Sequence, residues 1–540
     1  MLHARLPARA RTHLRRTGAG IGAGVLALTL LPAATAASAP PVAVSTATRA
    51  ADDSAVTALV KPTRELSRLV AGFAPAGCTD RDRRVTPEET RLTAVLPAAW
   101  DPSRPAARTW ARTMVEGGGF GGWTRSFATG LCRADSLEDA TAYVEKRGGA
   151  LWDRAVARAQ EKGKVRGRLP ASDDRPLYWV RTEAKAVLRQ WDPGFRLGGR
   201  KRADLVDAFD KAARGMLDID FPVGKKVKRT LVSGFDPYTL DGGTTGPAAG
   251  TVGNNIRHGN PSGATALALD GTRHRAKGGK VTSIEAYTLP VSYPEFERGY
   301  LEDTVGPFMR PGKRRLDASI TVSQAGGSQF NLEQWNSRYH GLSLGNDRYA
   351  GCQRVGDRLQ LAVDNPECNT RVVKRWGGGR TLHDPPQWTS ASLPIGRMIN
   401  ADTGASVPRP EGSTWPDPSV AFGVVWNTNY SYFPRCTDAA TVAVDQRQVT
   451  YPPTAEPTPP PAGSCAFSGA GGTYLSNESA YRNTLLRDRL GLKIPAGHIH
   501  TPDMQHFRSD FAPSDDLFDQ WRNAIVDQTR RLVHVVARTS

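Results

Sequence analysis

A serine and a histidine lie in neighbouring motifs near the C-terminal end of this 540-residue chain. Ser476 follows the glycine turn Gly471-Gly472, and a helical pattern begins directly after it. A hydroxyl at the start of a helix faces backbone N–H groups and the positive end of the helix dipole, which stabilise a developing oxyanion. His500 lies on a short apolar stretch one helix later. It could supply the base that a hydroxyl nucleophile requires.

The spacing of these two residues also fits a purely structural interpretation. Serine is a common N-cap, so Ser476 could cap the helix that follows it. His500 could equally be a histidine of a surface loop. His498, two residues earlier, is expected on the opposite face of the strand with a structural role.

The N-terminal 39 residues predict a signal peptide. A basic segment ends at Arg15-Arg16, an apolar run covers residues 21–31, and small residues follow up to residue 39. That run is too short for stable membrane insertion. Residues 40–60, rich in Ala, Ser, Thr, Val and Pro, predict a disordered linker. We therefore expect a secreted, extracellular protein.

The chain carries a formal net charge of +18, and removing the five arginines of the leader leaves +13. The basic residues are scattered, and no basic run is interleaved with aromatic residues. Nucleic acid binding is therefore not indicated. Association with an anionic cell-wall polymer explains this charge equally well.

Cysteine usage agrees with export. In an oxidising compartment cysteines form disulfides by default, and neither Cys-x-x-Cys nor His-Glu-x-x-His occurs, so we expect no metal site. Six cysteines allow 15 pairings. We predict the sequential one, Cys78–Cys132, Cys352–Cys368 and Cys436–Cys465.

Two regions differ in their periodicity. Residues 61–224 predict a helical accessory domain, with amphipathic patterns over 137–160, 177–190 and 204–216. From residue 225 to 540, strand and helix patterns alternate, which predicts a three-layer α/β/α domain with a mainly parallel sheet. The expected strands are 227–235, 280–289, 316–322 and 420–426, and the expected helices between them include 294–305 and 395–400. The Pro-rich segment 429–467 is an insertion, either at the mouth of the site or a plain surface loop.

Four motifs in the second region resemble the pyroglutamyl peptidase I (pyrrolidone-carboxylate peptidase) family. In chain order they are Leu231-Val-Ser-Gly-Phe-Asp-Pro-Tyr, Asn260-Pro-Ser with Leu269-Asp-Gly, Gln324-Ala-Gly-Gly with Phe330-Asn-Leu-Glu333, and Gly472-Thr-Tyr-Leu-Ser-Asn477 with Ala496-Gly-His-Ile-His500-x-Pro. Each is weak alone, but their shared order indicates kinship. Residues 1–224 lie outside the resemblance.

The resemblance implies hydrolysis of the amide after an N-terminal pyroglutamate by a Cys-His-Glu (or Asp) triad on an α/β/α fold, without metal or other cofactor. Glu333 and His500 fall on the acid and the histidine of that triad. The nucleophile departs from the family pattern, because Ser476 occupies the cysteine position. Glu478 occupies a position where the family usually has histidine. His340, near Glu333 in the sequence, is a rival base that no motif supports.

Serine in place of cysteine changes what the histidine must do. A cysteine attacks as a thiolate, whereas an alcohol loses its proton during attack, so His500 must act as a general base oriented by Glu333. Outside the cell an alcohol also resists oxidation, unlike a thiol. The predicted function is a secreted peptidase-like hydrolase that removes an N-terminal pyroglutamyl or similar small acyl group from peptides. The alternative is a non-catalytic binding or structural descendant, and the oligomeric state is not predicted.

A pyroglutamyl group needs apolar walls and one or two polar partners, because it is a small neutral lactam. By the resemblance, the substrate-binding candidates are Phe235, Tyr238, Asn260, Gln324, Tyr474 and Leu475. Phe235 could instead belong to the core. Asn260 could support the oxyanion or merely cap a helix.

Overall fold

The computed structural model describes residues 59–95, 108–164, 166–241, 254–275, 277–341, 343–349, 385–409, 418–436, 441–445, 449–453, 456–504, 506–508 and 512–540, together with short strands between 354 and 383. The predicted signal peptide, nearly all of the predicted linker 40–60, and the cysteines Cys352 and Cys368 lie outside the described residues.

Helices make up the N-terminal part of the described chain. They are α1 (Arg64–Ala71), α2 (Trp110–Gly117), α3 (Trp123–Leu131), α4 (Leu137–Ala159), α5 (Arg175–Gln190) and α6 (Gly199–Ala212). The helix predicted over 137–160 is confirmed to within one residue as α4. It begins at Leu137 because Ser136 caps it, accepting from the Asp139 N–H at 3.1 Å. The helix predicted over 204–216 begins earlier, because its first turn is too basic to show apolar periodicity.

The second part is built on one seven-stranded sheet with the order β14-β5-β18-β4-β1-β3-β2. Neighbouring strands β18, β4, β1 and β3 run parallel, while β2 pairs antiparallel with β3 and β5 pairs antiparallel with β18. The strands are β1 (Val227–Phe235), β2 (Thr272–Arg275), β3 (Val281–Leu289), β4 (Ala318–Gln324), β5 (Phe330–Glu333), β14 (Val424–Asn427) and β18 (Ala496–Thr501). The expected strand 227–235 is confirmed at both ends.

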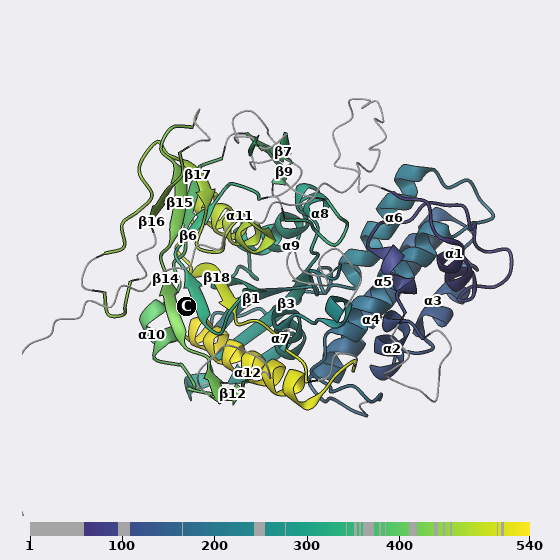
Figure 1. Ribbon diagram of the computed structural model, residues 1–540, viewed down its shortest axis with the longest axis horizontal. Helices are drawn as coiled ribbons and strands as arrows, with labels where there is room; N and C mark the ends of the chain where they lie inside the picture. Colours follow the sequence, from purple (N-terminus) through teal and green to yellow (C-terminus); the bar gives the residue numbers. More distant parts are fainter. Residues whose placement is uncertain are drawn as a thin grey trace, which may run out of the picture. The chain divides into compact units, whose positions relative to one another are not determined.

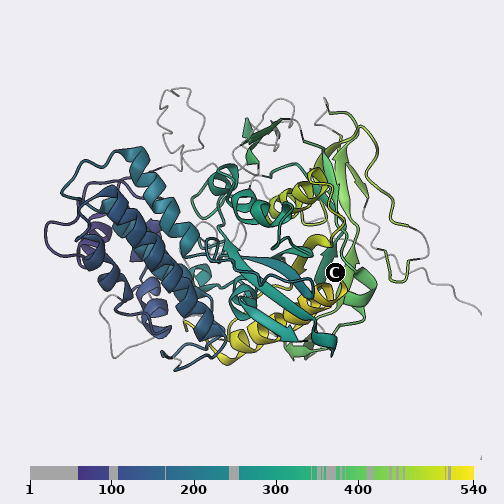
Figure 2. The ribbon, with the colours of Figure 1, turned by 180° about the vertical axis from the view of Figure 1, so that it is seen from behind.

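Helices cover both faces of this sheet (Figures 1 and 2). One layer contains α7 (Pro261–Leu269) and the C-terminal α12 (Asp516–Thr539), and the other contains α9 (Tyr300–Met309) and α11 (Leu475–Arg489). The predicted three-layer α/β/α fold is therefore confirmed. No helix in the described part of the chain is long and apolar enough to cross a membrane.

Two expected elements are divided in the structure. The helix predicted over 294–305 is split into α8 (Tyr293–Glu297) and α9, because Gly299 takes a positive φ of 79° between them. The strand predicted over 420–426 is also wrong. Its residues divide between β13 (Ser419–Ala421), which pairs with β12 (Ser406–Pro408), and β14 of the main sheet. The predicted helix 395–400 is present as α10 (Ile395–Ile399).

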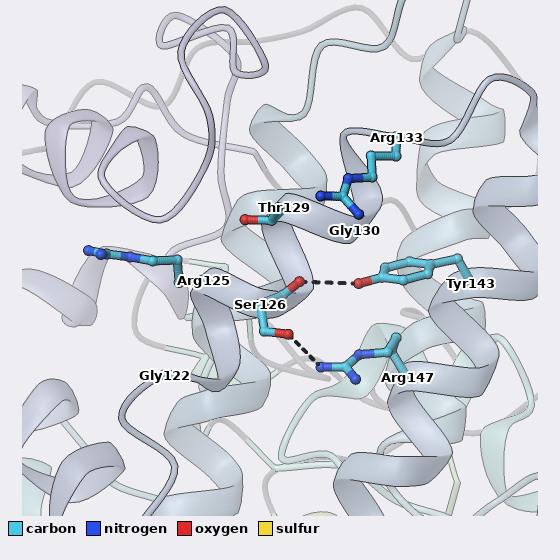
Figure 3. A pocket seen from close by; sticks show the side chains of 8 residues that line it. All are labelled: Gly122, Arg125, Ser126, Thr129, Gly130, Arg133, Tyr143 and Arg147. Atoms are coloured by element: carbon cyan, nitrogen blue, oxygen red, sulfur yellow. Dashed lines mark hydrogen bonds between the residues drawn. The ribbon is translucent and has the colours of Figure 1, made fainter.

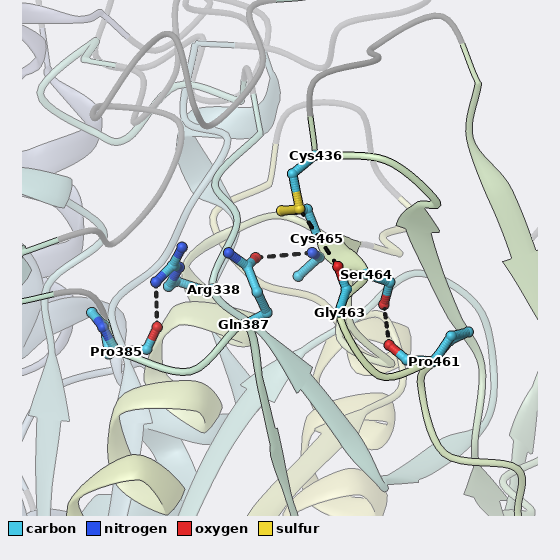
Figure 4. Close-up of a disulfide and its surroundings, with 9 residues drawn as sticks. Arg338, Pro385, Gln387, Cys436, Pro461, Gly463, Ser464 and Cys465 are labelled. Carbon is cyan, nitrogen blue, oxygen red and sulfur yellow. Dashed lines mark hydrogen bonds between the residues drawn. A yellow bond between two sulfur atoms is a disulfide. The ribbon is translucent and has the colours of Figure 1, made fainter.

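A second, smaller sheet lies in the Pro-rich segment. Its strands are β15 (Tyr430–Phe433), β16 (Ala443–Asp445) and β17 (Cys465–Ser468). The Cys436–Cys465 disulfide closes its base, and the Gln387 side chain accepts the Ala466 N–H at 3.0 Å beside it (Figure 4). The remaining pairs are β6 (Trp335–Ser337) with β11 (Trp388–Ser390), β7 (Arg354–Val355) with β8 (Arg358–Leu359), and β9 (Val372–Trp376) with β10 (Arg380–His383).

The helical part contacts the sheet part through buried charges. Asp236, the residue after β1, pairs with Arg181 of α5 and, at 2.8 Å, with Arg214. Asp174 accepts the Asn260 N–H at 3.0 Å. All described residues belong to the same contact unit, Ser54–Ser540. The helical part therefore supports the loop that follows β1, where two of the substrate-binding candidates lie.

Candidate active site

Ser476 is the second residue of α11 and is buried, with 8% of its surface exposed. The helix starts after Tyr474, whose side chain makes no capping hydrogen bond. Gly472 precedes it at a φ of 81°, a conformation that favours glycine. Ser476 is thus inside the first turn and is not the N-cap. Its Oγ donates to the Gly471 carbonyl oxygen at 3.1 Å.

His500 and Glu333 form a buried pair across two neighbouring strands. His500 is on β18 and Glu333 ends β5, with Nδ1 and Oε1 separated by 2.5 Å. Burial would raise the pKa of Glu333, but the His500 and His498 imidazoles outweigh it and hold that pKa below its usual range. The carboxylate therefore stays ionised and fixes the imidazole with Nε2 on the side away from Glu333. His500 is a strand residue and not part of a surface loop.

Gly471 joins the serine to this pair. A Cβ on Gly471 would lie 2.5 Å from Glu333 Oε2, so the backbone packs directly on the carboxylate. The same residue accepts the Ser476 hydroxyl. Gly471 therefore contacts both the Glu333 carboxylate, which holds His500, and the Ser476 hydroxyl, although Glu333 is far from Ser476 in sequence.

His498 lies beside His500, and the expectation that it faces the other way was wrong. Residues two apart on a strand share a face, and the two ring centroids are 4.9 Å apart. The His498 nitrogens lie 2.7 Å from Thr321 Oγ1 and 2.8 Å from Ser323 Oγ. Burial lowers its pKa to about 3, so it is neutral at physiological pH.

Glu333, His498 and His500 each place one potential ligand atom within 4.8 Å of the others. A cation at this cluster would have to break the hydrogen bonds of His498 and the His500–Glu333 pair. These contacts describe a hydrogen-bonded network, and we propose no metal here.

The substrate-binding candidates fall into two groups. Tyr238, Gln324 and Tyr474 come together near the carboxyl ends of β1 and β4. The rings of Tyr238 and Tyr474 have centroids 6.4 Å apart, and the Gln324 amide donates to Tyr238 Oη at 3.2 Å. Tyr474 is held by its own hydroxyl, which donates to the Leu344 carbonyl at 2.8 Å.

The other three candidates are placed in structural roles. Phe235 stacks on Phe296 with centroids 6.1 Å apart and is buried in the core, as is Leu475. Asn260 caps α7, accepting from Ser262 N at 3.1 Å and donating to the Asp236 carbonyl at 2.9 Å. The Asn260 side-chain amide is therefore already hydrogen-bonded to protein groups at both its nitrogen and its oxygen.

Asp503 is a site residue that the sequence argument missed. It lies three residues after His500, at the end of the same motif, and accepts from the Gln324 amide at 3.2 Å. Burial raises its pKa to about 7. Its position directly after the His-Ile-His-Thr-Pro motif was the signal that could have identified it.

A second histidine–carboxylate pair involves the rival base. His340 Nε2 lies 2.5 Å from Glu478 Oε2, on the first turns of α11. Glu478 also pairs with Arg482, which in turn lies 2.8 Å from Glu302. Burial would raise the pKa of Glu478, but His340 and Arg482 lower it to about 2. His340 is thus tied to α11 and not to Glu333.

Comparison with known proteins identifies relatives along nearly the whole described chain. Residues 71–210 match the family model described as PA0049 N-terminal domain, and residues 229–505 match the model PA0049, C-terminal domain. The uncharacterized protein PA0049 of Pseudomonas aeruginosa is 43% identical over 500 residues, which cover 84% of this chain and 89% of that protein.

Solved structures of pyroglutamyl peptidases are also similar to this chain. A mutant pyrrolidone carboxyl peptidase from Pyrococcus furiosus is 15% identical and covers 58% of this chain and 99% of its own, with a TM-score of 0.30. Pyroglutamyl peptidase I from Bacillus amyloliquefaciens is 19% identical and covers 57% and 95%, with a TM-score of 0.29. The structures concerned belong to the family that the sequence motifs resemble.

Proposed function

The chain belongs to the PA0049 family, and we propose that it is a hydrolase that removes an N-terminal pyroglutamyl or similar small acyl group from peptides. Ser476 is the nucleophile, His500 the general base and then acid, and Glu333 the orienting carboxylate. The observation that supports this most is the buried contact of 2.5 Å between His500 Nδ1 and Glu333 Oε1, next to the glycine that accepts the Ser476 hydroxyl.

The proposed mechanism follows from the positions of these groups. Ser476 turns its hydroxyl from Gly471 toward His500 Nε2, which takes the proton as Oγ attacks the acyl carbon. Glu333 stabilises the imidazolium that forms. The first N–H groups of α11, which the Tyr474 side chain leaves uncapped, face the oxyanion. His500 then protonates the leaving amine, and water repeats the sequence to release the acid.

The lactam ring would bind among Tyr238, Tyr474, Gln324 and Asp503. A pyroglutamyl group has one N–H donor and one C=O acceptor. The Gln324 amide nitrogen donates to Tyr238 and Asp503, whereas its Oε1 is buried with no hydrogen-bond partner among the described residues. That oxygen would accept the lactam N–H, which would remove the cost of leaving it unpaired.

We further propose that the protein is secreted and acts on peptides outside the cell, with retention by anionic cell-wall polymer. The leader pattern of residues 1–39 and the net charge of +13 that is left without the five leader arginines support this. So do the disulfides Cys78–Cys132 and Cys436–Cys465, which are of the kind that persists in an oxidising compartment.

One contact favours a second candidate function, a non-catalytic binding protein on the same scaffold. The Ser476 hydroxyl donates to the Gly471 carbonyl and not to His500. In a protein that only binds its ligand, this hydrogen bond would stabilise the turn. Serine in place of the family's cysteine would then make the protein inactive as a hydrolase.

Release of fluorophore from a pyroglutamyl-coumarin amide separates the two functions. The test compares the mature protein with Ser476→Ala and Ser476→Cys. Turnover by the wild type and loss of at least about 10³-fold in Ser476→Ala supports the serine triad. If the wild type releases no fluorophore but Ser476→Cys does, the pocket is intact and the result supports the binding function. If none of the three folded proteins releases the fluorophore, the proposal that a pyroglutamyl group is the substrate is overturned.

A further inference from the structure

A basic pocket lies between α3 and α4 of the helical part, formed by none of the candidate active-site residues (Figure 3). It has a volume of about 590 Å³. Arg125 comes from α3, Arg133 from the turn after it, and Arg147 from α4. Ser126 and Thr129 add hydroxyl groups to the lining, and no acidic residue lines it.

The three guanidinium groups have no ion-pair partner among the described residues. By contrast, Arg112 of α2 pairs with Glu116 and Glu183, both at 3.1 Å. Arg147 contacts only neutral groups, namely the Trp123 ring at 5.3 Å and the Ser126 hydroxyl at 3.4 Å. Figure 3 shows Arg133 and Arg147 on the side of α3 that faces Tyr143, whereas Arg125 extends away from them. An anion bound near Arg133 and Arg147 would be attracted by both guanidinium groups.

The pocket walls are held in place without a ligand. The Tyr143 hydroxyl of α4 donates to the Phe127 carbonyl of α3 at 2.9 Å. A side chain on Gly130 would collide with that same hydroxyl, so the glycine allows the two helices to approach. The Cys78–Cys132 disulfide anchors the end of α3 next to Arg133. The two helices that form the pocket are therefore fixed against each other before binding, which lowers the entropy cost of binding.

We propose that this pocket binds phosphate groups. Guanidinium forks donate two parallel hydrogen bonds to a phosphate, and serine and threonine hydroxyls donate additional ones. The volume exceeds what a single phosphate needs, so an ester chain also fits. The aromatic groups are not free to stack on bases, since Tyr143 is tied to α3 and Trp123 lies under Arg147. The phosphate group is the chemistry recognised, whether it comes from a small phosphate ester or from a phosphodiester polymer.

Binding is tested by calorimetry on the full-length mature protein. The titrants are inorganic phosphate, glycerol phosphate and an oligomer of glycerol phosphate. The test variant carries Arg125→Gln, Arg133→Gln and Arg147→Gln. The control carries Arg530→Gln, Arg531→Gln and Arg538→Gln in a second pocket of about 500 Å³ on α12, where Asp527 pairs with Arg530 at 3.3 Å. Both variants lose three positive charges.

We expect the test variant to bind at least tenfold more weakly and the control to stay within twofold of the wild type. Binding of all three titrants indicates recognition of phosphate itself, and binding of the oligomer alone indicates a polymeric ligand. Equal weakening in both variants would show a mere net-charge effect and overturn the proposal, as would a wild type that binds no titrant. Thr129→Trp keeps every charge while filling the pocket, and must also abolish binding. The inference does not depend on the proposed hydrolysis.

Discussion

Two buried histidine–carboxylate pairs of equal length flank the start of α11 and differ in what surrounds them. His500–Glu333 and His340–Glu478 are both separated by 2.5 Å, and both carboxylates are almost completely buried. Glu333 has only imidazoles as charged neighbours. Glu478 also holds Arg482, which is shared with Glu302.

This difference distinguishes the proposed catalytic pair from a structural one. A carboxylate whose only partner is an imidazole can stabilise a proton arriving on that ring. A carboxylate already neutralised by a guanidinium gains less from it, and its role is to fix the position of α11. Both pairs join a histidine to a carboxylate, but their surroundings differ. We therefore expect loss of one pair to affect catalysis and loss of the other to affect stability.

The largest difference is expected in catalysis. His500→Ala should lower kcat/KM for a pyroglutamyl-coumarin amide by about 10³-fold, because the general base is lost. His340→Ala should lower it by less than about tenfold. Circular dichroism verifies that both variants are folded. An equal loss in the two variants would contradict the different roles assigned to the two pairs.

Stability should respond in the opposite order. Arg482→Met leaves Glu478 and Glu302 buried without their cation, so the free energy of unfolding in urea should fall by about 3–5 kcal/mol. Arg489→Met, at an exposed position on the same helix, should change it by less than about 1 kcal/mol. If Arg482→Met unfolds like the control, the second pair is not a structural anchor.

A smaller effect is expected at the glycine that joins the first pair to the serine. Gly471→Ala places a Cβ 2.5 Å from Glu333 Oε2 and should displace the carboxylate. We expect kcat to fall by about 10- to 100-fold with KM little changed. Gly149→Ala on α4, where a Cβ meets nothing within 4 Å, is the matched control. Full activity of Gly471→Ala would refute this packing argument.

The smallest effect concerns acid stability. The folded pKa of Glu478 is lowered from 4.5 to about 2, so its stabilisation is present above about pH 4.5 and is lost as the pH falls toward 2. The difference in unfolding free energy between wild type and Glu478→Gln should shrink with a slope of up to about 1.4 kcal/mol per pH unit. Urea titrations at pH 6, 4 and 3 measure it. A difference that stays constant with pH would contradict the assigned shift.

Short-range patterns predicted much of the framework. Strand β1, helix α4 and the α/β/α layering were correct because periodicity and capping depend on residues a few positions apart. The proposed catalytic residues also lie in compact motifs, and their roles stay a prediction. Short-range patterns could not predict that β5 runs antiparallel to β18, with β14 parallel to β5, because strand direction depends on the path of the chain between strands.

The sequence by itself thus determined the class of fold and the residue types that we propose for acyl-transfer chemistry. Only the tertiary structure decided the partners. It paired His340 with Glu478, used Asn260 as a cap, buried Phe235 in the core, and brought Asp236 to the arginines of the helical part. It also gathered the arginines of α3 and α4 around one pocket. These contacts join residues far apart in the chain, so they form only when the buried faces of separate elements pack together.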